Sequence, residues 1–299
     1  MKMITEAIRR HPVSAFYILS FTVSWTGVLL AAGGPAGLPA DEDELDRLLP
    51  VVVIAMVAGP LLAGPLITAL VSGRAGFHRI RQQIQIWRVH PAWYALALLT
   101  GPVVVLAAAL PLSAWSADFM PTLFTADEKT PIVLSGLIAG LVAGICEELG
   151  WTAFAVTHLR TRHTVVPTGL IVGSLWGLWH LGVAYWGAGT PDGHLSPLTL
   201  ATQLTFYLGV LPAYRILMVW QFTRTGSLTL AILMHAGLTG STTFILASDV
   251  GDLQRLALYL AEAGICWAIV AVAAESGALQ DPTTHANPPY RMESTKASA

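Results

Sequence analysis

Four ionisable side chains stand inside apolar stretches of this sequence: the adjacent carboxylates Glu147 and Glu148, and the imidazoles of His180 and His235. The two glutamates directly follow PIVLSGLIAGLVAGIC, a run without any charge. Carboxylates and imidazoles are the groups with which proteins activate water or relay protons, and they are costly in hydrocarbon unless they are paired. The four residues therefore predict a shared polar site that other helices shield from lipid.

Small residues accompany each of these groups at helical spacing. Residues four apart share one face of a helix, and stripes of small residues let membrane helices pack closely. Three segments each combine such a stripe with an ionisable residue: Gly136, Gly140, Gly144 and Glu148; Gly169, Gly173, Gly177 and then His180; Ser227, Ala231, His235 and Thr239. We expect the histidines to meet the glutamates from separate helices.

The estimated depths of these residues agree with one another. At a rise of about 1.5 Å per residue, Glu147 lies roughly 18 Å from a helix end near Leu159. On the same basis His180 lies roughly 20 Å from the start of its helix, and His235 roughly 13 Å from Gly226. In a hydrocarbon core about 30 Å thick, all three levels fall near the middle.

The composition indicates an integral membrane protein. Of the 299 residues, 54% are hydrophobic and only 11% are charged, whereas soluble domains carry about 25% charged residues. The net charge of -2 gives no reason to expect a nucleic-acid partner. Cys146 and Cys266 both lie in apolar runs, where we interpret them as small packing residues. Ala, Gly and Pro are abundant, and Lys is scarce beside Arg. This composition is typical of a bacterial protein from a GC-rich genome.

The fold expected from the apolar runs is all-α, a polytopic membrane bundle. A spanning helix needs about 20 mostly apolar residues, and we find about eight such segments. They run roughly Val13 to Ala32, Val51 to Val71, Trp93 to Trp115, Ile132 to Leu159, Val165 to Trp186, Leu200 to Phe222, Ser227 to Ala247, and Leu253 to Ala274.

The distribution of basic residues predicts the orientation. Most arginines lie before the first apolar segment or in the connections that follow the second, fourth and sixth segments. Because basic residues favour the cytoplasmic side of a membrane, this distribution predicts that both termini are in the cytoplasm. We interpret the first apolar segment as a retained helix, because it is longer than the core of a typical signal peptide. We expect residues 1–275 to form a single transmembrane domain, and residues 276–299 to form a disordered cytoplasmic tail.

The segment EELGWTAFAVTHLRTRHTVVPTGLIVGSLWGLWHL resembles the CPBP family of intramembrane proteases, which includes the type II CAAX prenyl endopeptidases and bacteriocin-immunity-type membrane proteins. The family's first motif is a glutamate pair followed by an arginine. Its second is an aromatic residue and a histidine with three residues between them, here Trp176 and His180. Its third is a histidine followed four residues later by asparagine, and TGSLTLAILMHAGLTG is similar to it around His235. The resemblance covers about residues 132–241.

Two positions depart from the family pattern. Thr152 stands where the family has the arginine that orients the glutamates, and Thr239 stands where it has the asparagine that helps bind an oxyanion. Thr239 keeps a hydroxyl donor, but Thr152 supplies no charge. Arg215 of the sixth segment is a candidate substitute, because an arginine there requires a partner. We hypothesise that it pairs with Glu147 or Glu148; the alternatives are that it snorkels to the cytoplasm or pairs with Glu262.

The resemblance implies peptide hydrolysis in the membrane. It implies Glu147 as general base, His180 as a second contact of the water, His235 and Thr239 as oxyanion donors, and Glu148 as the residue that orients the network. A divalent metal such as zinc is left open beside metal-free catalysis, with Glu148, His180 and His235 as candidate ligands. Eukaryotic members release a C-terminal tripeptide from prenylated proteins.

The leading interpretation is an intramembrane endopeptidase of the cell membrane, acting on a membrane-associated, CAAX-like or otherwise lipidated peptide or protein, with membrane lipid as its surroundings. A second interpretation is a non-catalytic immunity or scaffold protein of the same family, because two motif positions are changed. A third is a proton-coupled transporter, because such proteins also place Glu, His and Arg at the middle of the membrane.

Overall fold

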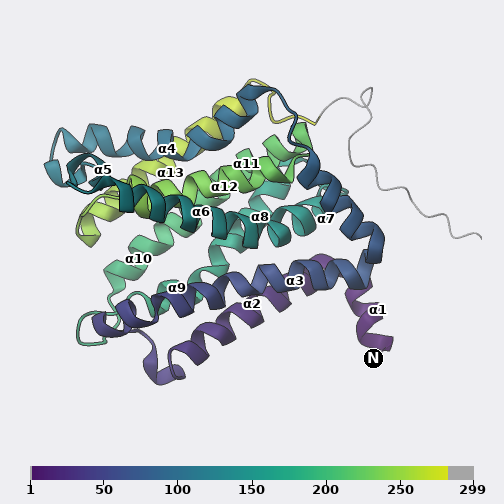
Figure 1. Ribbon diagram of the computed structural model, residues 1–299, viewed down its shortest axis with the longest axis horizontal. Helices are drawn as coiled ribbons and strands as arrows, with labels where there is room; N and C mark the ends of the chain where they lie inside the picture. The colour runs from purple at the N-terminus through teal and green to yellow at the C-terminus, as the bar shows by residue number, and fades with distance from the viewer. Residues whose placement is uncertain (1, 282–299) are drawn as a thin grey trace, which may run out of the picture.

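A computed structural model describes residues 2–281 and shows a bundle built from α-helices, as the apolar segments predict. The longer helices run side by side along one axis (Figure 1). The described residues contain no β-strand, only an isolated bridge between Gly189 and Leu195. The α-helices are α1 (Lys2–Arg10), α2 (Pro12–Ala31), α3 (Glu42–Gln85), α4 (Pro91–Ser113), α5 (Thr122–Thr125), α6 (Lys129–Gly150), α7 (Thr157–Leu159), α8 (Val165–Trp179), α9 (Leu181–Trp186), α10 (Pro197–Thr205), α11 (Leu211–Thr225), α12 (Leu228–Gly240) and α13 (Asp252–Glu275).

Two short 3-10 turns, η1 (Pro35–Gly37) and η2 (Ala117–Phe119), lie in connections between these helices. The longest helix, α3, contains a kink at Gly73, whose φ of 54° lies in the left-handed region that favours glycine. The kink separates the apolar part of α3 from the basic segment that follows it. Each side of the kink can therefore take its own direction.

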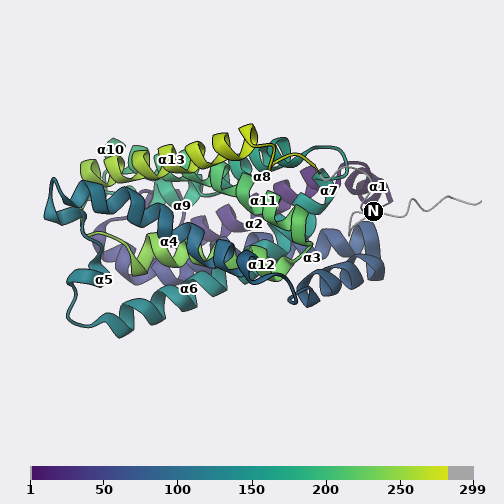
Figure 2. The same ribbon diagram turned by 90° about the horizontal axis from the view of Figure 1, so that it is seen from above.

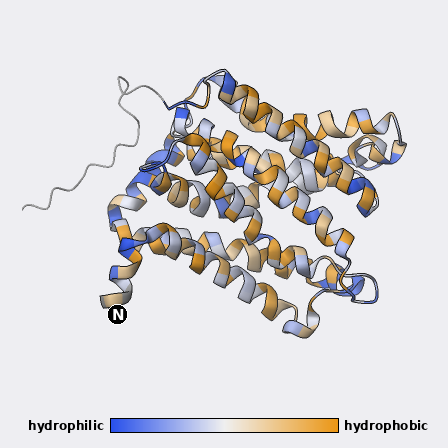
Figure 3. Cartoon of the chain, turned by 180° about the vertical axis from the view of Figure 1, so that it is seen from behind, coloured by the Kyte–Doolittle hydropathy of each residue, from blue (hydrophilic) through white to orange (hydrophobic). Residues whose placement is uncertain are grey.

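Seven helical stretches in the described chain are long and apolar enough to cross a membrane. They match seven of the eight predicted segments, and the protein is a multi-pass membrane protein. Figure 3 shows apolar residues along the helices and hydrophilic residues gathered toward the two ends of the bundle. Large apolar side chains such as Ile54, Leu99 and Ile138 are exposed on the outside, where lipid would cover them.

The predicted sixth segment does not meet this criterion of length and apolarity, although it is helical throughout Pro197–Thr225. It contains Gln203, Arg215 and Gln221, which lower its hydropathy. Its second half, α11, is almost entirely buried. A helix surrounded by protein does not need an apolar face toward lipid, so counting apolar runs is an imperfect guide to a helix in the centre of a bundle.

The two described ends of the chain lie at the same end of the bundle (Figures 1 and 2), as the eight predicted segments require. Residues 276–281, which the sequence analysis assigns to a tail, turn back onto the bundle. Leu279 is buried there, Asp281 pairs with Arg160, and Arg224 donates to backbone carbonyls of residues 278 and 280. The rest of the predicted tail, 282–299, lies outside the described residues. The predicted single domain and cytoplasmic termini remain predictions.

The two glycine stripes join two pairs of helices. On α6, a Cβ at Gly140 would lie 2.5 Å from the Ala236 carbonyl oxygen, and one at Gly144 would lie 2.6 Å from that of Ile232. The stripe therefore packs α6 directly against the backbone of α12. On α8, a Cβ at Gly173 would lie 2.6 Å from the Cα of Pro212 in α11. These close approaches bring the residues that follow each stripe together in the interior.

Three π-helical segments interrupt the helices that surround this interior: η3 (Trp151–Val156), η4 (Phe206–Val210) and η5 (Ser241–Ile245). The first begins three residues after Glu148, and the third begins two residues after Thr239. A π-turn adds a residue to the turn and rotates the side chains that follow it, and such turns are frequent at functional sites. Here the three π-helical segments lie directly before or after the helices that carry Glu147, Arg215 and His235.

Candidate active site

Glu148 is the fixed member of the glutamate pair. It is fully buried, and Arg215 of α11 holds it with both terminal nitrogens, at 2.9–3.0 Å from its two carboxylate oxygens. The Thr152 hydroxyl donates to Oε2, and His235 Nδ1 lies 2.7 Å from Oε1. Both oxygens are thus occupied by donors from three different segments, so this carboxylate can orient its neighbours but is not available to substrate.

Glu147, Glu148 and Glu262 were the carboxylates considered as partners of Arg215, and the structure pairs it with Glu148. Its guanidinium also lies over the Trp176 ring, 4.2 Å from the ring centroid. The Thr152 hydroxyl and the Arg215 charge therefore reach the same carboxylate from opposite helices. Between them they supply the hydrogen bond and the charge that one arginine of the family motif is expected to supply.

Glu147 is held on one side only. Its Oε2 accepts hydrogen bonds from the indole N–H groups of Trp151 at 3.0 Å and Trp176 at 2.8 Å. Its Oε1 has no hydrogen-bond partner among the described residues, and the side chain lines a cavity. One oxygen therefore fixes the carboxylate in place, while the other faces the space in which a substrate or water would lie.

Trp151 is itself fixed by α2. Its ring stacks on Tyr17 with centroids 5.6 Å apart, and Phe16 meets it edge to face at 5.4 Å. The N-terminal helix thus contributes to the site through an aromatic side chain rather than through a polar group. Trp151 was not predicted as a site residue, although its spacing of four residues from Glu147 places both on one helix face.

His180 lies where α8 gives way to α9, with its ring exposed to the cavity. Its Nδ1 lies 2.9 Å from the Trp176 carbonyl oxygen, so Nδ1 carries the hydrogen and Nε2 has a lone pair. The ring stacks on Tyr207 of η4 at 4.2 Å and meets Trp179 edge to face. Nε2 has no hydrogen-bond partner in the described chain, and it can accept a hydrogen bond from a water or a substrate.

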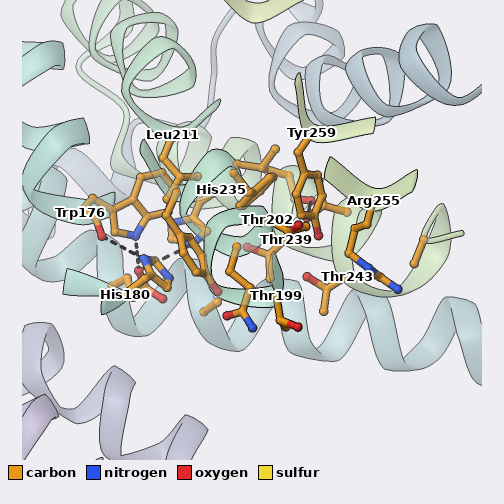
Figure 4. A pocket seen from close by; sticks show the side chains of 18 of the residues that line it. Trp176, His180, Thr199, Thr202, Leu211, His235, Thr239, Thr243, Arg255 and Tyr259 are labelled. Carbon is orange, nitrogen blue, oxygen red and sulfur yellow. Dashed lines mark hydrogen bonds and ion pairs between the residues drawn. The ribbon is translucent and has the colours of Figure 1, made fainter. Parts of the chain in front are cut away.

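His235 connects the two glutamates. Its Nδ1 contacts Glu148, and its Nε2 lies 3.9 Å from Glu147 Oε2. Its ring packs against Trp176, with centroids 4.9 Å apart. Thr239, one turn further along α12, lines the same cavity. The side chains of Glu147, His180, His235 and Thr239 therefore surround one space, as Figure 4 shows for the three that it labels.

The cavity has a volume of about 490 Å³ and extends well beyond the glutamate. From Glu147, Trp176 and His180 it passes a row of threonines on α10, α12 and η5. At its far end it reaches Asp252, Arg255 and Tyr259 of α13 (Figure 4). No residue of this far end was expected from the sequence, because none of them belongs to a motif around the glutamates and histidines.

The proposed metal ligands do not form a metal site as they are placed. Both oxygens of Glu148 are taken by Arg215, Thr152 and His235, and His235 Nδ1 is in turn taken by Glu148. The described residues contain no group of three His, Cys, Asp or Glu side chains that could hold a metal ion. Because the donor set does not fit, we derive no step through a metal.

The fold and the site define a class, a multi-pass helical membrane protein with a buried glutamate and histidine centre. Comparison with known proteins narrows this class. Residues 129–240 match the family described as "Type II CAAX prenyl endopeptidase Rce1-like". A protein named CAAX prenyl protease 2, from Methanococcus maripaludis, is similar over 122 residues at 27% identity, which covers 40% of this chain and 39% of that protein.

These findings confirm the resemblance to CPBP-family proteases that was drawn from the motifs. The matched region runs from the start of α6 to the end of α12, so it contains the glutamates, the histidines and Arg215. The aromatic pair of α2 and the end of the cavity formed by η5 and α13 lie outside it. The chain spans about two fifths of the length of the curated relative in this match.

Proposed function

We propose that the protein is an intramembrane endopeptidase of the cell membrane that hydrolyses a membrane-associated peptide or protein, including lipidated, CAAX-like substrates. The observation that carries the proposal is the asymmetric hold on Glu147. Two indole N–H groups fix one oxygen, while the other oxygen faces a cavity beside two imidazoles. A fixed carboxylate with one open oxygen is suited to take a proton from water.

In this mechanism a water lies between Glu147 Oε1 and His180 Nε2. Glu147 takes its proton as the oxygen attacks the scissile carbonyl carbon, and a tetrahedral oxyanion forms. His235, whose Nδ1 contacts Glu148, turns its Nε2 toward the oxyanion as a donor, and the Thr239 hydroxyl adds a second donor. Glu147 then gives its proton to the leaving nitrogen as the C–N bond breaks, which yields a carboxyl terminus and an amine.

Glu148, Arg215 and Thr152 position the reacting groups in this scheme. Arg215 neutralises the charge of Glu148, and Glu148 in turn fixes the ring of His235. The two changed motif positions were the reason to consider a non-catalytic immunity or scaffold protein. The Thr152 and Arg215 contacts to Glu148 provide a physical replacement for the missing arginine, and this supports the enzyme.

The test is cleavage of synthetic lipidated peptides by the purified protein in proteoliposomes. We expect Glu147→Gln to lower kcat by about 10³-fold, because general base catalysis contributes on this order. A matched control is Glu262→Gln on α13, which removes another buried carboxylate that does not line the cavity. The control should retain cleavage, and both variants should elute as the wild type does in size-exclusion chromatography.

Undiminished cleavage by Glu147→Gln would overturn the proposed mechanism. If the wild type cleaves nothing and Glu147→Gln keeps its biological role in cells, the immunity or scaffold role is favoured instead. Elemental analysis of the purified protein, combined with activity after chelator treatment, tests metal dependence. Activity that survives complete removal of metal is the outcome expected from this donor set.

A further inference from the structure

A second cavity lies at the end of the bundle that holds the two described ends of the chain. It shares no lining residue with the cavity beside Glu147. Its volume is about 310 Å³, and its walls come from two segments: the junction of α1 with α2, and the end of α7 with the connection to α8. Figures 1 and 2 show α1 and α7 at this end of the bundle. We call this space the end cavity.

The walls of the end cavity carry basic side chains and no acid. Six of its lining residues are basic: Arg9, Arg10, His11, His158, Arg162 and His163. None of the described residues that line it is Asp or Glu. Two acids do contact arginines nearby. Glu6 pairs with Arg10 at 3.1 Å, and Asp281 pairs with Arg160, which does not line the end cavity. The space is therefore bounded by an excess of positive charge.

Two of these arginines have donors to spare. Arg162 is exposed, and its side chain makes no hydrogen bond or ion pair with the described residues. Arg9 donates its Nε to the Leu70 carbonyl at 3.2 Å, and its two terminal nitrogens have no partner in the described chain. A guanidinium presents its N–H groups as a planar fork that matches the oxygens of a phosphate. Arg9 and Arg162 can therefore hold a phosphate group from two sides.

The level of the end cavity in the bundle indicates which phosphate fits. Its basic residues directly precede α2, lie near the end of the apolar stretch Lys129–Leu159, or connect that stretch to Val165–Trp186, and all three are long and apolar enough to cross a membrane. This is the level of lipid headgroups. Pro12, Val13 and Leu159 line the same cavity, so apolar side chains lie beside the cations. A lipid offers both a phosphate and the start of its acyl chains to such a wall.

Contacts behind the walls hold the end cavity in shape. Arg160 is largely buried, and it donates to the His163 carbonyl and to the Thr223 hydroxyl in addition to its pair with Asp281. These bonds fix the connection that carries Arg162. On the opposite wall, the bond from Arg9 to Leu70 ties α1 to α3.

We propose that the end cavity binds the headgroup phosphate of an anionic membrane lipid, with Arg9 and Arg162 donating to its oxygens. Basic residues in general gather at the cytoplasmic surface of membrane proteins. The end cavity differs from a diffuse basic surface because two separate segments place their cations around one space without an acid. The bound lipid would join the α1–α2 junction to the α7–α8 connection. The inference does not depend on the proposed peptidase activity.

The test is titration of fluorescent phosphatidylglycerol against the purified full chain in a neutral detergent, with fluorescent phosphatidylcholine as the comparison. We expect the wild type to bind the anionic lipid about tenfold more tightly, and Arg9→Gln/Arg162→Gln to lose this preference. The matched control is Arg74→Gln/Arg81→Gln, which removes the same charge from the basic part of α3 outside the end cavity. This control should keep the preference, and equal losses in both double variants would overturn the site.

The single variant Arg162→Gln guards against a folding defect, because this exposed side chain has no partner among the described residues. It should elute as the wild type does and bind phosphatidylglycerol about fivefold more weakly. Unchanged binding by this variant would contradict the proposal.

A competition experiment distinguishes a lipid from a soluble phosphate ester. A large excess of glycerol 3-phosphate should leave the fluorescent phosphatidylglycerol bound, because the ester lacks the acyl chains that contact the apolar wall. Displacement of the lipid by the ester from the wild type would overturn the assignment to a lipid.

Discussion

Glu147 and Glu148 are consecutive residues, yet their surroundings are opposite in kind. Glu148 is enclosed by a guanidinium, a hydroxyl and an imidazole, and neither of its oxygens reaches the cavity. Glu147 is held through one oxygen by two indoles, and its other oxygen is open. Neighbours in a helix point about 100° apart, so one turn of helix presents one carboxylate to the protein and the other to the cavity.

A third buried glutamate sharpens this comparison. Glu262 on α13 is as buried as Glu147, but its Oε2 has no hydrogen-bond partner among the described residues and it lines no cavity around the site. Burial alone therefore does not distinguish a reactive carboxylate in this protein. The difference lies in whether donors fix one oxygen while space is left beside the other.

The substitution expected to disturb the contacts of Glu148 most is Arg215→Met. This change leaves Glu148 buried without its cation, which we expect to cost about 3–5 kcal/mol of stability. Thermal unfolding in detergent measures the loss, and activity should fall with it because His235 is no longer held. The double variant Arg215→Met/Glu148→Met should regain much of the stability but no activity. A single variant that unfolds and cleaves as the wild type does would contradict the positioning role.

Separating the helices should disturb both sides of the site together. In Gly140→Ala the new methyl group would lie 2.5 Å from the Ala236 carbonyl oxygen, beside His235. Overpacking of this kind costs about 1–3 kcal/mol, and we expect a comparable loss of thermal stability with reduced kcat. Gly264→Ala on α13 is the control, because a Cβ there meets nothing within 4 Å. Equal behaviour of the two variants would show that the stripe does not set the site.

A smaller effect is expected from Thr152→Val. It removes one donor to Glu148 and keeps the shape of the side chain, so we expect a loss of about 1–2 kcal/mol and a modest decrease in kcat. Thr168→Val on α8 is a matched control, because the Thr168 hydroxyl is buried and has no partner in the described chain. Thermal unfolding of both variants should show destabilisation at position 152 alone.

The sequence predicted the glutamates and histidines of the site better than the residues that surround them. The glycine stripes on α6 and α8 follow from spacing alone, and they lie at the helix contacts where they were expected. The sixth segment shows the limit of the same reasoning, because a helix buried among others does not have to be apolar. Trp151 was not predicted, although its spacing from Glu147 places both on one helix face, and Arg255 was not predicted because only the packing of α13 brings it to the cavity.

The sequence by itself determined the helical membrane class, the faces on which the acids and histidines lie, and the family that their spacing resembles. These properties are local, because they depend on hydropathy and on helical periodicity. Only the tertiary structure decided that Arg215 pairs with Glu148 rather than with Glu147 or Glu262, and that the cavity continues to Arg255. A side chain in a bundle can reach several neighbours of matching charge, and packing in three dimensions selects one of them.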